Sequence, residues 1–220
     1  MSILEFLFNI ITGISKGMGY TIALFIITLV FSMPLGLLCT FMSNGKNPVL
    51  RAITRGYVFL MRGTPLMLQL FFFYFGITKL PFIGKYLAME RFTAACVTFV
   101  LNYAAYFCEI FRGGLLSVDK GQYEASKVLG LTKWQTMIRV VLPQMFKVVL
   151  PPVSNEAITL VKDTALVTAI GISDVLHITK SLVNGTAGNI TPFIVAAIFY
   201  LLVTFGLTKL FKYLEKKFMF

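Results

Sequence analysis

Residues 121–144 read GQYEASKVLGLTKWQTMIRVVLPQ, a polar run of good helix formers between two long apolar regions. Gly130 interrupts this run, and Pro143 stands where the chain becomes apolar again. Polar side chains gain nothing from insertion into a bilayer, because an unpaired polar group in hydrocarbon costs free energy. We therefore expect a helical loop over residues 112–144 that contacts something in an aqueous compartment.

The composition around this loop is that of a membrane protein. Hydrophobic residues make up 57% of the 220 positions, charged residues only 13%, and the mean hydropathy is +0.82. A soluble domain carries about 25% charged residues, so we predict an all-α integral membrane protein in contact with lipid. The three cysteines lie in apolar surroundings without paired spacing, which indicates buried thiols rather than disulfides or a metal site.

Hydrophobic runs of about 20 residues are long enough to cross a bilayer as helices. Five such runs cover residues 20–42, 57–77, 92–111, 146–170 and 192–210. The second contains Arg62-Gly63-Thr64-Pro65, and we expect a broken span there with Thr64 as N-cap and Pro65 as the first residue of a new helix. Residues 171–190 read as a mixed loop.

The first 16 residues carry a narrow polar stripe on an otherwise apolar helix. The stripe consists of Ser2, Glu5, Asn9, Thr12 and Lys16, at steps of three and four. This pattern predicts a separate helix over residues 1–16 that lies along the membrane surface, followed by one membrane domain over residues 17–220. The alternative is that these residues extend the first span.

The distribution of positive charge predicts the orientation. With five spans, 13 lysines and arginines fall on one side and five on the other, while Arg62 and Lys162 lie within spans. The positive-inside rule places the richer side in the cytoplasm. The N-terminus is then outside and the C-terminus inside, with the 112–144 loop cytoplasmic. The net charge of +11 is therefore explained by membrane orientation, and no nucleic acid is needed as a partner.

Catalytic and nucleotide-binding motifs are missing from the sequence. No G-x-x-x-x-G-K-[ST] occurs, no nucleophile clusters with a base, and His177 stands alone. We predict a protein that is not an enzyme and binds neither a cofactor nor a metal. Any use of ATP and magnesium would need a second polypeptide.

The polar loop has the features of a docking element. We expect one short helix over residues 122–129, a turn at Gly130, and a second helix capped by Thr132 that Pro143 ends. Ala125 and Ser126 are small enough for close approach of a partner, and Glu124 offers an anion. The alternative is an ordinary solvated loop. Trp134 reads equally as a lipid-headgroup contact or as an anchor in a protein interface.

This loop resembles the cytoplasmic EAA loop of bacterial ABC importer permeases, with Ser126 in place of the second alanine and Val140 in place of isoleucine. Over about residues 17–176 the chain is similar to the polar amino acid (histidine/glutamine-type) permeases. The matching motifs are Arg62-Gly63-Thr64-Pro65, Ala105-Tyr106 with Glu109, Arg112-Gly113-Gly114, Gly121-Gln122, Leu142-Pro143-Gln144, Pro151, Asn155 and Lys162-Asp163-Thr164, with Ala165 where the family often has serine.

The resemblance implies a subunit of an amino acid importer in the bacterial inner membrane. Its expected partners are two copies of an ABC ATPase, a second permease in a homodimer or heterodimer, and an extracytoplasmic amino acid-binding protein. The residues that the resemblance assigns to ATPase coupling are Gly121, Glu124, Ala125, Ser126, Gly130, Leu142 and Pro143.

Polar residues within the spans are expected to face protein or water, since a charge in hydrocarbon is costly. Four of them are charged and are expected to have a gating or structural role, namely Arg62, Glu109, Lys162 and Asp163. For Lys162 and Asp163 we expect partners in Glu109, Glu156 or an opposing subunit. Polar residues form one stripe on the third predicted span and one on the fourth, and together the stripes supply the hydrogen-bond donors and acceptors that a zwitterionic substrate needs. To this substrate path we assign Asn102, Tyr106, Asn155, Glu156 and Thr159. The alternative is hydrogen bonding that holds the helices together. The excess of carboxylates favours a basic or neutral substrate.

Two other kinds of protein fit parts of the sequence. A stand-alone secondary transporter or channel driven by an ion gradient would use the in-span charges as a relay, although no inverted repeat is visible. A membrane anchor without a transport path would place the polar spans against lipid.

Overall fold

The structure, a computed structural model, describes residues 3–219, and every regular element within that range is a helix. α1 covers Ile3–Asn44, α2 Pro48–Gly63, and α3 Leu66–Phe71 with a π-helical turn at Phe72–Gly76 and a 3-10 turn at Ile77–Lys79. A further 3-10 turn, Gly84–Tyr86, precedes α4 at Arg91–Ser117. α5 is Lys120–Val128, α6 is Lys133–Thr136 with a π-helical turn at Met137–Val141, and α7 is Leu142–Asp163, continued by 3-10 helix Thr164–Ile170. α8 is Val175–Gly185 and α9 is Thr191–Met219.

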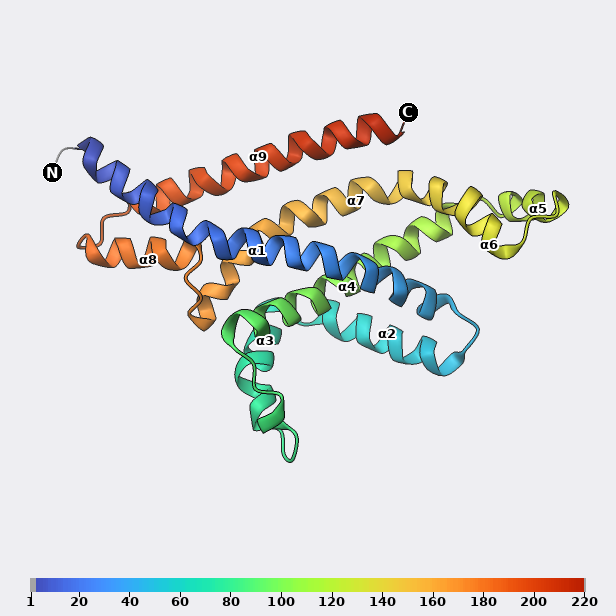
Figure 1. Cartoon of the computed structure of the whole chain (residues 1–220), viewed down its shortest axis with the longest axis horizontal. Coiled ribbons are helices and arrows are strands. Elements are labelled where there is room, and N and C mark those ends of the chain that lie inside the picture. The colour runs from blue at the N-terminus through green and yellow to red at the C-terminus, as the bar shows by residue number, and fades with distance from the viewer. Residues whose placement is uncertain (1–2, 220) are drawn as a thin grey trace.

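The predicted all-α, multi-span architecture is confirmed. Within residues 3–219, four helices are long and apolar enough to cross a membrane, and a fifth crossing results when α2 and the α3 segment are counted as one span bent by 107°. Figure 1 places α5 and α6 at one end of the molecule, with α8 and the N-terminal end of α1 at the other. In both views α9 lies on the outside of the bundle.

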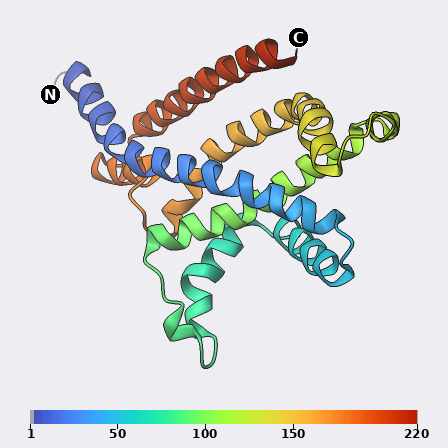
Figure 2. The same ribbon diagram turned by 45° about the vertical axis from the view of Figure 1, so that its right-hand side comes forward.

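The break in the second span is confirmed, but its cap differs from the prediction. Thr64 is the C-cap of α2, and α3 begins after Pro65, which makes no side-chain cap. The Thr64 hydroxyl donates to the carbonyl of Leu60 at 2.9 Å and accepts from Gln69 Nε2 at 2.8 Å. Since its side chain is used in this way, it does not cap α3. Figure 2 shows the α3 segment turning away from α2.

The prediction of a separate surface helix over residues 1–16 is wrong, because α1 continues unbroken through Lys16. Its 42 residues correspond to a length of about 63 Å, roughly twice the hydrocarbon thickness. The polar positions Glu5, Asn9, Thr12 and Lys16 are exposed as expected, and Ser2 lies outside the described residues. The opposite face packs on α8 and α9 through Ile10 and Ile14, and this packing keeps the segment aligned with the rest of α1.

Gly17 is the point at which α1 approaches the start of α8. A Cβ added there would lie 2.6 Å from the backbone carbon of Asp174 and 2.6 Å from the nitrogen of Val175. We expect Gly17→Val to lower the stability of the folded protein by about 1–3 kcal/mol, because backbone cannot move aside as a side chain can. Thermal unfolding of the detergent-solubilised protein measures this change.

The matched control is Gly19→Val on the same helix. No atom lies within 4 Å of a Cβ at Gly19, so this variant carries the same β-branched side chain without the clash. Equal melting temperatures for the two variants would contradict the close approach of α1 to α8.

α4 is the centre of the bundle and packs against α1, α2, α3 and α7. Its aromatic side chains Phe99, Tyr103 and Phe107 are fully buried. On α1, Gly36 allows contact so close that a Cβ there would lie 2.9 Å from the carbonyl oxygen of Ala104. α4 therefore fixes the positions of both halves of the broken span.

The region predicted as a mixed loop, residues 171–190, contains α8. Asp174 caps this helix by accepting from the backbone N–H groups of His177 at 3.0 Å and Leu176 at 3.2 Å. Burial raises the pKa of the Asp174 carboxyl, while these hydrogen bonds act in the opposite direction. The helix has only 11 residues, too few for its periodicity to stand out between the polar residues around it.

Candidate functional site

The break between α2 and α3 opens a cavity of about 410 Å³ between α2, α4 and α7, which we call the break cavity. Its lining residues are Arg62, Gly63, Thr64, Pro65, Leu66, Asn102, Tyr103, Tyr106, Glu156, Thr159 and Asp163. Four of the five residues assigned to the substrate path lie here, together with two of the predicted gating charges. Asn155 is exposed and does not line this cavity.

Asn102 holds the broken span in place. Its amide nitrogen donates to the carbonyl of Met61 at 3.1 Å and to Oε1 of Gln69 at 2.9 Å, and its side chain is buried. Gln69 Nε2 donates in turn to the carbonyls of Met61 and Thr64. Both N–H donors of Asn102 are therefore used within the bundle. This favours the alternative role for Asn102, a hydrogen bond that holds helices together, over direct contact of its N–H groups with substrate.

Tyr103 is a member of the site that the sequence pattern did not reveal. Its hydroxyl donates to Oδ2 of Asp163 at 2.8 Å, joining α4 to the end of α7. Of the partners predicted for Asp163, neither Glu109 nor Glu156 bonds it within this chain, where Tyr103 is its hydrogen-bond partner, and the opposing subunit stays a prediction. The sequence signal was slight, since tyrosine is common in apolar spans and Tyr103 continues an aromatic run on α4.

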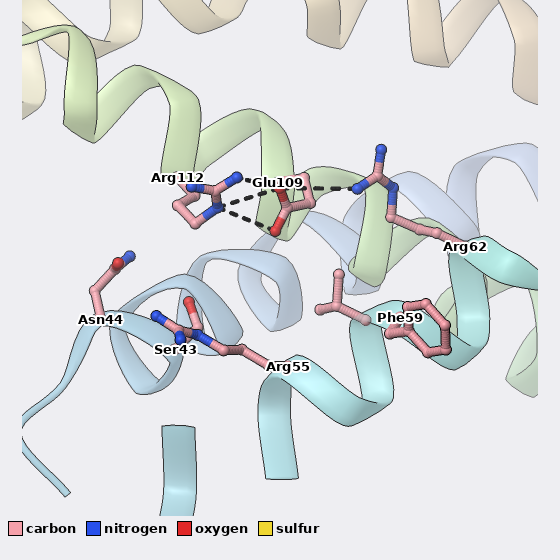
Figure 3. Close-up of a pocket in the computed structure, with 8 residues that line it drawn as sticks. Ser43, Asn44, Arg55, Phe59, Arg62, Glu109 and Arg112 are labelled. Carbon is pink, nitrogen blue, oxygen red and sulfur yellow. Dashed lines mark hydrogen bonds and ion pairs between the residues drawn. The ribbon is translucent and has the colours of Figure 1, made fainter. Parts of the chain in front are cut away.

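A second cavity of about 360 Å³ adjoins the first at Arg62, and we call it the arginine cavity. It is lined by Ser43, Asn44, Arg55, Val58, Phe59, Arg62, Glu109 and Arg112. Glu109 accepts from Arg112 Nε at 3.1 Å to each carboxylate oxygen and from Nη2 at 2.6 Å. Arg62 Nη1 lies farther away, 3.8 Å from Glu109 Oε2. Figure 3 shows the carboxylate of Glu109 between the two guanidinium groups.

The polar loop forms a compact helical pair. Asp119 caps α5 by accepting from the N–H of Gly121 at 2.7 Å, and Gly130 takes a left-handed φ of 72° at the turn. Thr132 and Gln135 form a capping box at α6. Glu124 and Ala125 are exposed, as a docking element requires. Gln144 Nε2 donates to Gln122 Oε1 at 3.3 Å, which connects α5 to the start of α7.

Two expectations for this loop are wrong. Ser126 is buried rather than presented at the surface, and its hydroxyl donates to the carbonyl of Gln122 in the same helix at 2.7 Å. Pro143 does not end the helix, since the helical path from α6 runs continuously through α7. The π-helical turn at Met137–Val141 precedes it, and Pro143 lies in the first turn of α7, where a missing N–H is tolerated.

An apolar surface surrounds the exposed face of the helical pair. Val128, Leu129 and Trp134 are 88%, 77% and 72% exposed, and a cluster of exposed apolar side chains marks an interaction site. A groove of about 620 Å³ runs between α5 and α6 beside them. Its lining residues are Tyr123, Lys127, Leu131, Thr132, Lys133, Thr136 and Met137. The loop therefore has the shape and surface of a binding element.

Residues 32–219 match the family described as binding-protein-dependent transport system inner membrane component. The chain belongs to this family. As an inner membrane component it is a multi-pass membrane protein and a transport subunit, not an enzyme. Membership also implies a binding protein and an ATPase as partners.

Other members and solved structures are similar over almost the whole chain. The probable amino-acid ABC transporter permease protein YckA of Bacillus subtilis is 35% identical over 89% of this chain and 87% of its own length. The glutamine transport system permease protein GlnP of Escherichia coli is 32% identical over 92% and 91%. The crystal structure of an amino acid ABC transporter with histidines has a TM-score of 0.88 at 28% identity, covering 99% of both chains. The MetNI methionine ABC transporter, at 19% identity and a TM-score of 0.74, shows the same fold.

In this inner membrane component, two predicted polar residues lie outside both cavities. Asn155 and Lys162 are exposed on α7, and Thr159, which lines the break cavity, is exposed on the same helix. Lys162 forms no ion pair within residues 3–219. Exposed polar groups in a span are expensive against lipid, so this side of α7 needs a polar covering that the single chain does not supply.

Arg91, the first residue of α4, joins three segments. Its Nε donates to the Tyr74 hydroxyl at 3.2 Å and its Nη1 donates to the carbonyl of Gly171 at 3.1 Å. The broken span, α4 and the turn after α7 are thereby connected beside a cavity of about 550 Å³. Sequence reasoning missed this contact, because an arginine at a loop boundary carries no signal of its partner. No group of three or more potential metal ligands occurs within the described residues.

Proposed function

We propose that this permease subunit passes polar amino acids through the membrane, with the break cavity as the substrate site. The observation that carries the proposal is the charge arrangement of that cavity, which has Arg62 together with the carboxylates of Glu156 and Asp163. A zwitterion needs a donor for its carboxylate and an acceptor for its ammonium, and this cavity offers both. The relatives that transport glutamine, arginine and L-cystine by name support the same substrate class.

The energy source is a separate ATPase that docks on α5 and α6. Glu124 and Ala125 are exposed there beside the apolar surface formed by Val128, Leu129 and Trp134. ATP and magnesium bind to the partner, and this chain contributes no cofactor site. Residues Gly121, Gly130, Leu142 and Pro143 shape the docking element rather than contacting nucleotide.

A second permease covers the polar side of α7 in our proposal. Asn155, Thr159 and Lys162 would then face a shared aqueous path instead of lipid, which removes the cost of exposing them in a span. The complex consists of two permeases, two ATPases and an extracytoplasmic binding protein. Alternating access follows from movement of the broken span and α7 around the break cavity.

The proposed orientation has the N-terminus outside and the α5–α6 loop in the cytoplasm. We expect a cysteine at Asn184 to react with a membrane-impermeant maleimide in intact cells, and a cysteine at Lys127 to react only after permeabilisation. Both positions are exposed. The native thiols Cys39, Cys96 and Cys108 are replaced by alanine in the background. Labelling of Lys127→Cys from outside intact cells would contradict the orientation and the docking role.

Reconstitution tests the function directly. The chain is placed in proteoliposomes with its cognate ATPase and binding protein, and ATP-dependent uptake of labelled amino acids is measured. We expect uptake that needs all components and at least one polar amino acid. Uptake by this chain alone, driven by an ion gradient without ATP, would support the stand-alone transporter, which neither the family nor the relatives favour.

A further inference from the structure

Arg62 occupies a unique place in the described part of the chain, because it lines both the break cavity and the arginine cavity. It stands at the last turn of α2, directly before the break. Its side chain is 43% exposed, which leaves the guanidinium open to the space on either side. Its guanidinium can therefore contact a ligand in either cavity.

The guanidinium of Arg62 is not saturated by its neighbours. Within residues 3–219 it donates no hydrogen bond of normal length; its nearest anion, Glu109, is 3.8 Å away. It also lies over the ring of Tyr106, 5.4 Å from the centroid. A cation over an aromatic ring keeps its N–H groups at the edge available. Five N–H donors in a planar fork suit a carboxylate that approaches in that plane.

Glu109 is already engaged by another arginine. Arg112 holds it with three contacts of 2.6 to 3.1 Å. A single carboxylate thus serves Arg112 closely and Arg62 at a distance, while Arg55 adds a third guanidinium to the arginine cavity. The arginine cavity therefore has more guanidinium groups than carboxylates, so some of its positive charge has no close counter-ion. A carboxylate that arrives from the break cavity would supply one.

We propose that Arg62 binds the carboxylate of the transported amino acid and that Glu109 competes for Arg62, promoting release toward the arginine cavity. The proposal rests on the proposed function of the break cavity. The substrate ammonium would lie toward Glu156 and Asp163, which line the same cavity. As the substrate leaves, Arg62 returns from the substrate carboxylate to its position beside Glu109, 3.8 Å away in this structure.

Calorimetric titration of the detergent-purified permease–ATPase complex, without the binding protein, tests this assignment. The probes are L-arginine and L-glutamine, each compared with its α-amide, which keeps the ammonium and side chain but lacks the carboxylate charge. We expect Arg62→Gln to weaken binding of the amino acid about 10- to 100-fold. Binding of the α-amide should stay within about twofold, since it makes no charge-assisted bond to remove.

Three further variants make the test specific. Arg62→Lys keeps the charge without the fork and should give an intermediate ratio of amino acid to amide affinity. Glu109→Gln removes the competitor and should tighten amino acid binding about two- to fivefold while slowing uptake. The control Arg51→Gln takes an arginine from the same helix that lines neither cavity, and its ratio should equal that of the wild type.

The outcomes separate the assignment from the function on which it rests. If Arg62→Gln weakens binding of the amino acid and of its α-amide equally, or weakens neither, Arg62 does not bind the substrate carboxylate, and the assignment is overturned while the substrate site stands. If neither amino acid binds to the wild-type complex nor is taken up in proteoliposomes, the proposed function fails and the assignment falls with it. A changed ratio in the Arg51→Gln control would also overturn the assignment.

Discussion

Replacement of Ala125 by tryptophan is expected to abolish ATP-driven uptake while leaving the permease folded and inserted. Ala125 is exposed on α5 beside Glu124, where a small side chain lets a partner approach the helix backbone. A bulky indole would hold the two surfaces apart, and charge reversal by Glu124→Lys would remove the anion. Losses at the centre of an interface reach ~2 kcal/mol or more, equivalent to about a 30-fold weaker complex.

Co-purification of the ATPase with the tagged permease measures this effect, and size-exclusion of the permease reports its folding. The control is Ala197→Trp, an exposed alanine on the outer helix α9, far in sequence from the loop. It should retain the ATPase. Full coupling in Ala125→Trp would show that α5 is not the docking surface.

The second large effect is expected from the two carboxylates of the break cavity. Glu156→Gln and Asp163→Asn should each reduce uptake at low substrate concentration by about 10- to 100-fold, the range for losing a hydrogen bond to a charged group. Asparagine at position 163 can still accept from the Tyr103 hydroxyl, so the packing of α4 on α7 is retained. Uptake kinetics in proteoliposomes give the KM and the maximal rate separately.

A rise in KM is the signature of a lost substrate contact. Glu215→Gln, in the C-terminal part of α9 and outside both cavities, is the matched control and should leave KM unchanged. If the two variants lowered only the maximal rate, the carboxylates would act in the conformational change rather than in binding the ammonium.

Much of the fold was predictable because long apolar runs are a strong signal of spanning helices. The broken second span followed from Arg62-Gly63-Thr64-Pro65, since glycine and proline disrupt a helix wherever they occur together. The continuity of α1 was not predictable from the stripe that ends at Lys16, because the stabilising contacts of Ile10 and Ile14 come from α8 and α9. These contacts join residues more than 150 positions apart, beyond the reach of local periodicity.

The candidate site was predicted in its composition but not in its pairings. Polar residues at steps of three and four placed Tyr106, Glu156 and Thr159 on inner faces, and the break cavity brings them together. The periodicity could not show that Tyr103 bonds Asp163, because that pair depends on the rotation of α4 against α7. The pair of Arg112 with Glu109 lies within α4 at a spacing of three residues, which is a local signal that sequence reasoning did not use. Lys162 and Asn155 are exposed in the single chain, and in our proposal they face a second permease, which a single sequence does not describe.

The continuous helix from Lys133 to Ile170 has a mechanical consequence. From Trp134 on the docking surface to Glu156 in the break cavity is a distance of about 33 Å along one helical axis, with no flexible loop between them. Pro151 and Pro152 lack backbone N–H groups and so remove helical hydrogen bonds shortly before Glu156, which makes this the part of α7 that bends most easily. If the proposed ATPase tilts this helix at Trp134, the rigid connection carries the tilt to Glu156, so that work done on ATP in the water phase reaches the break cavity.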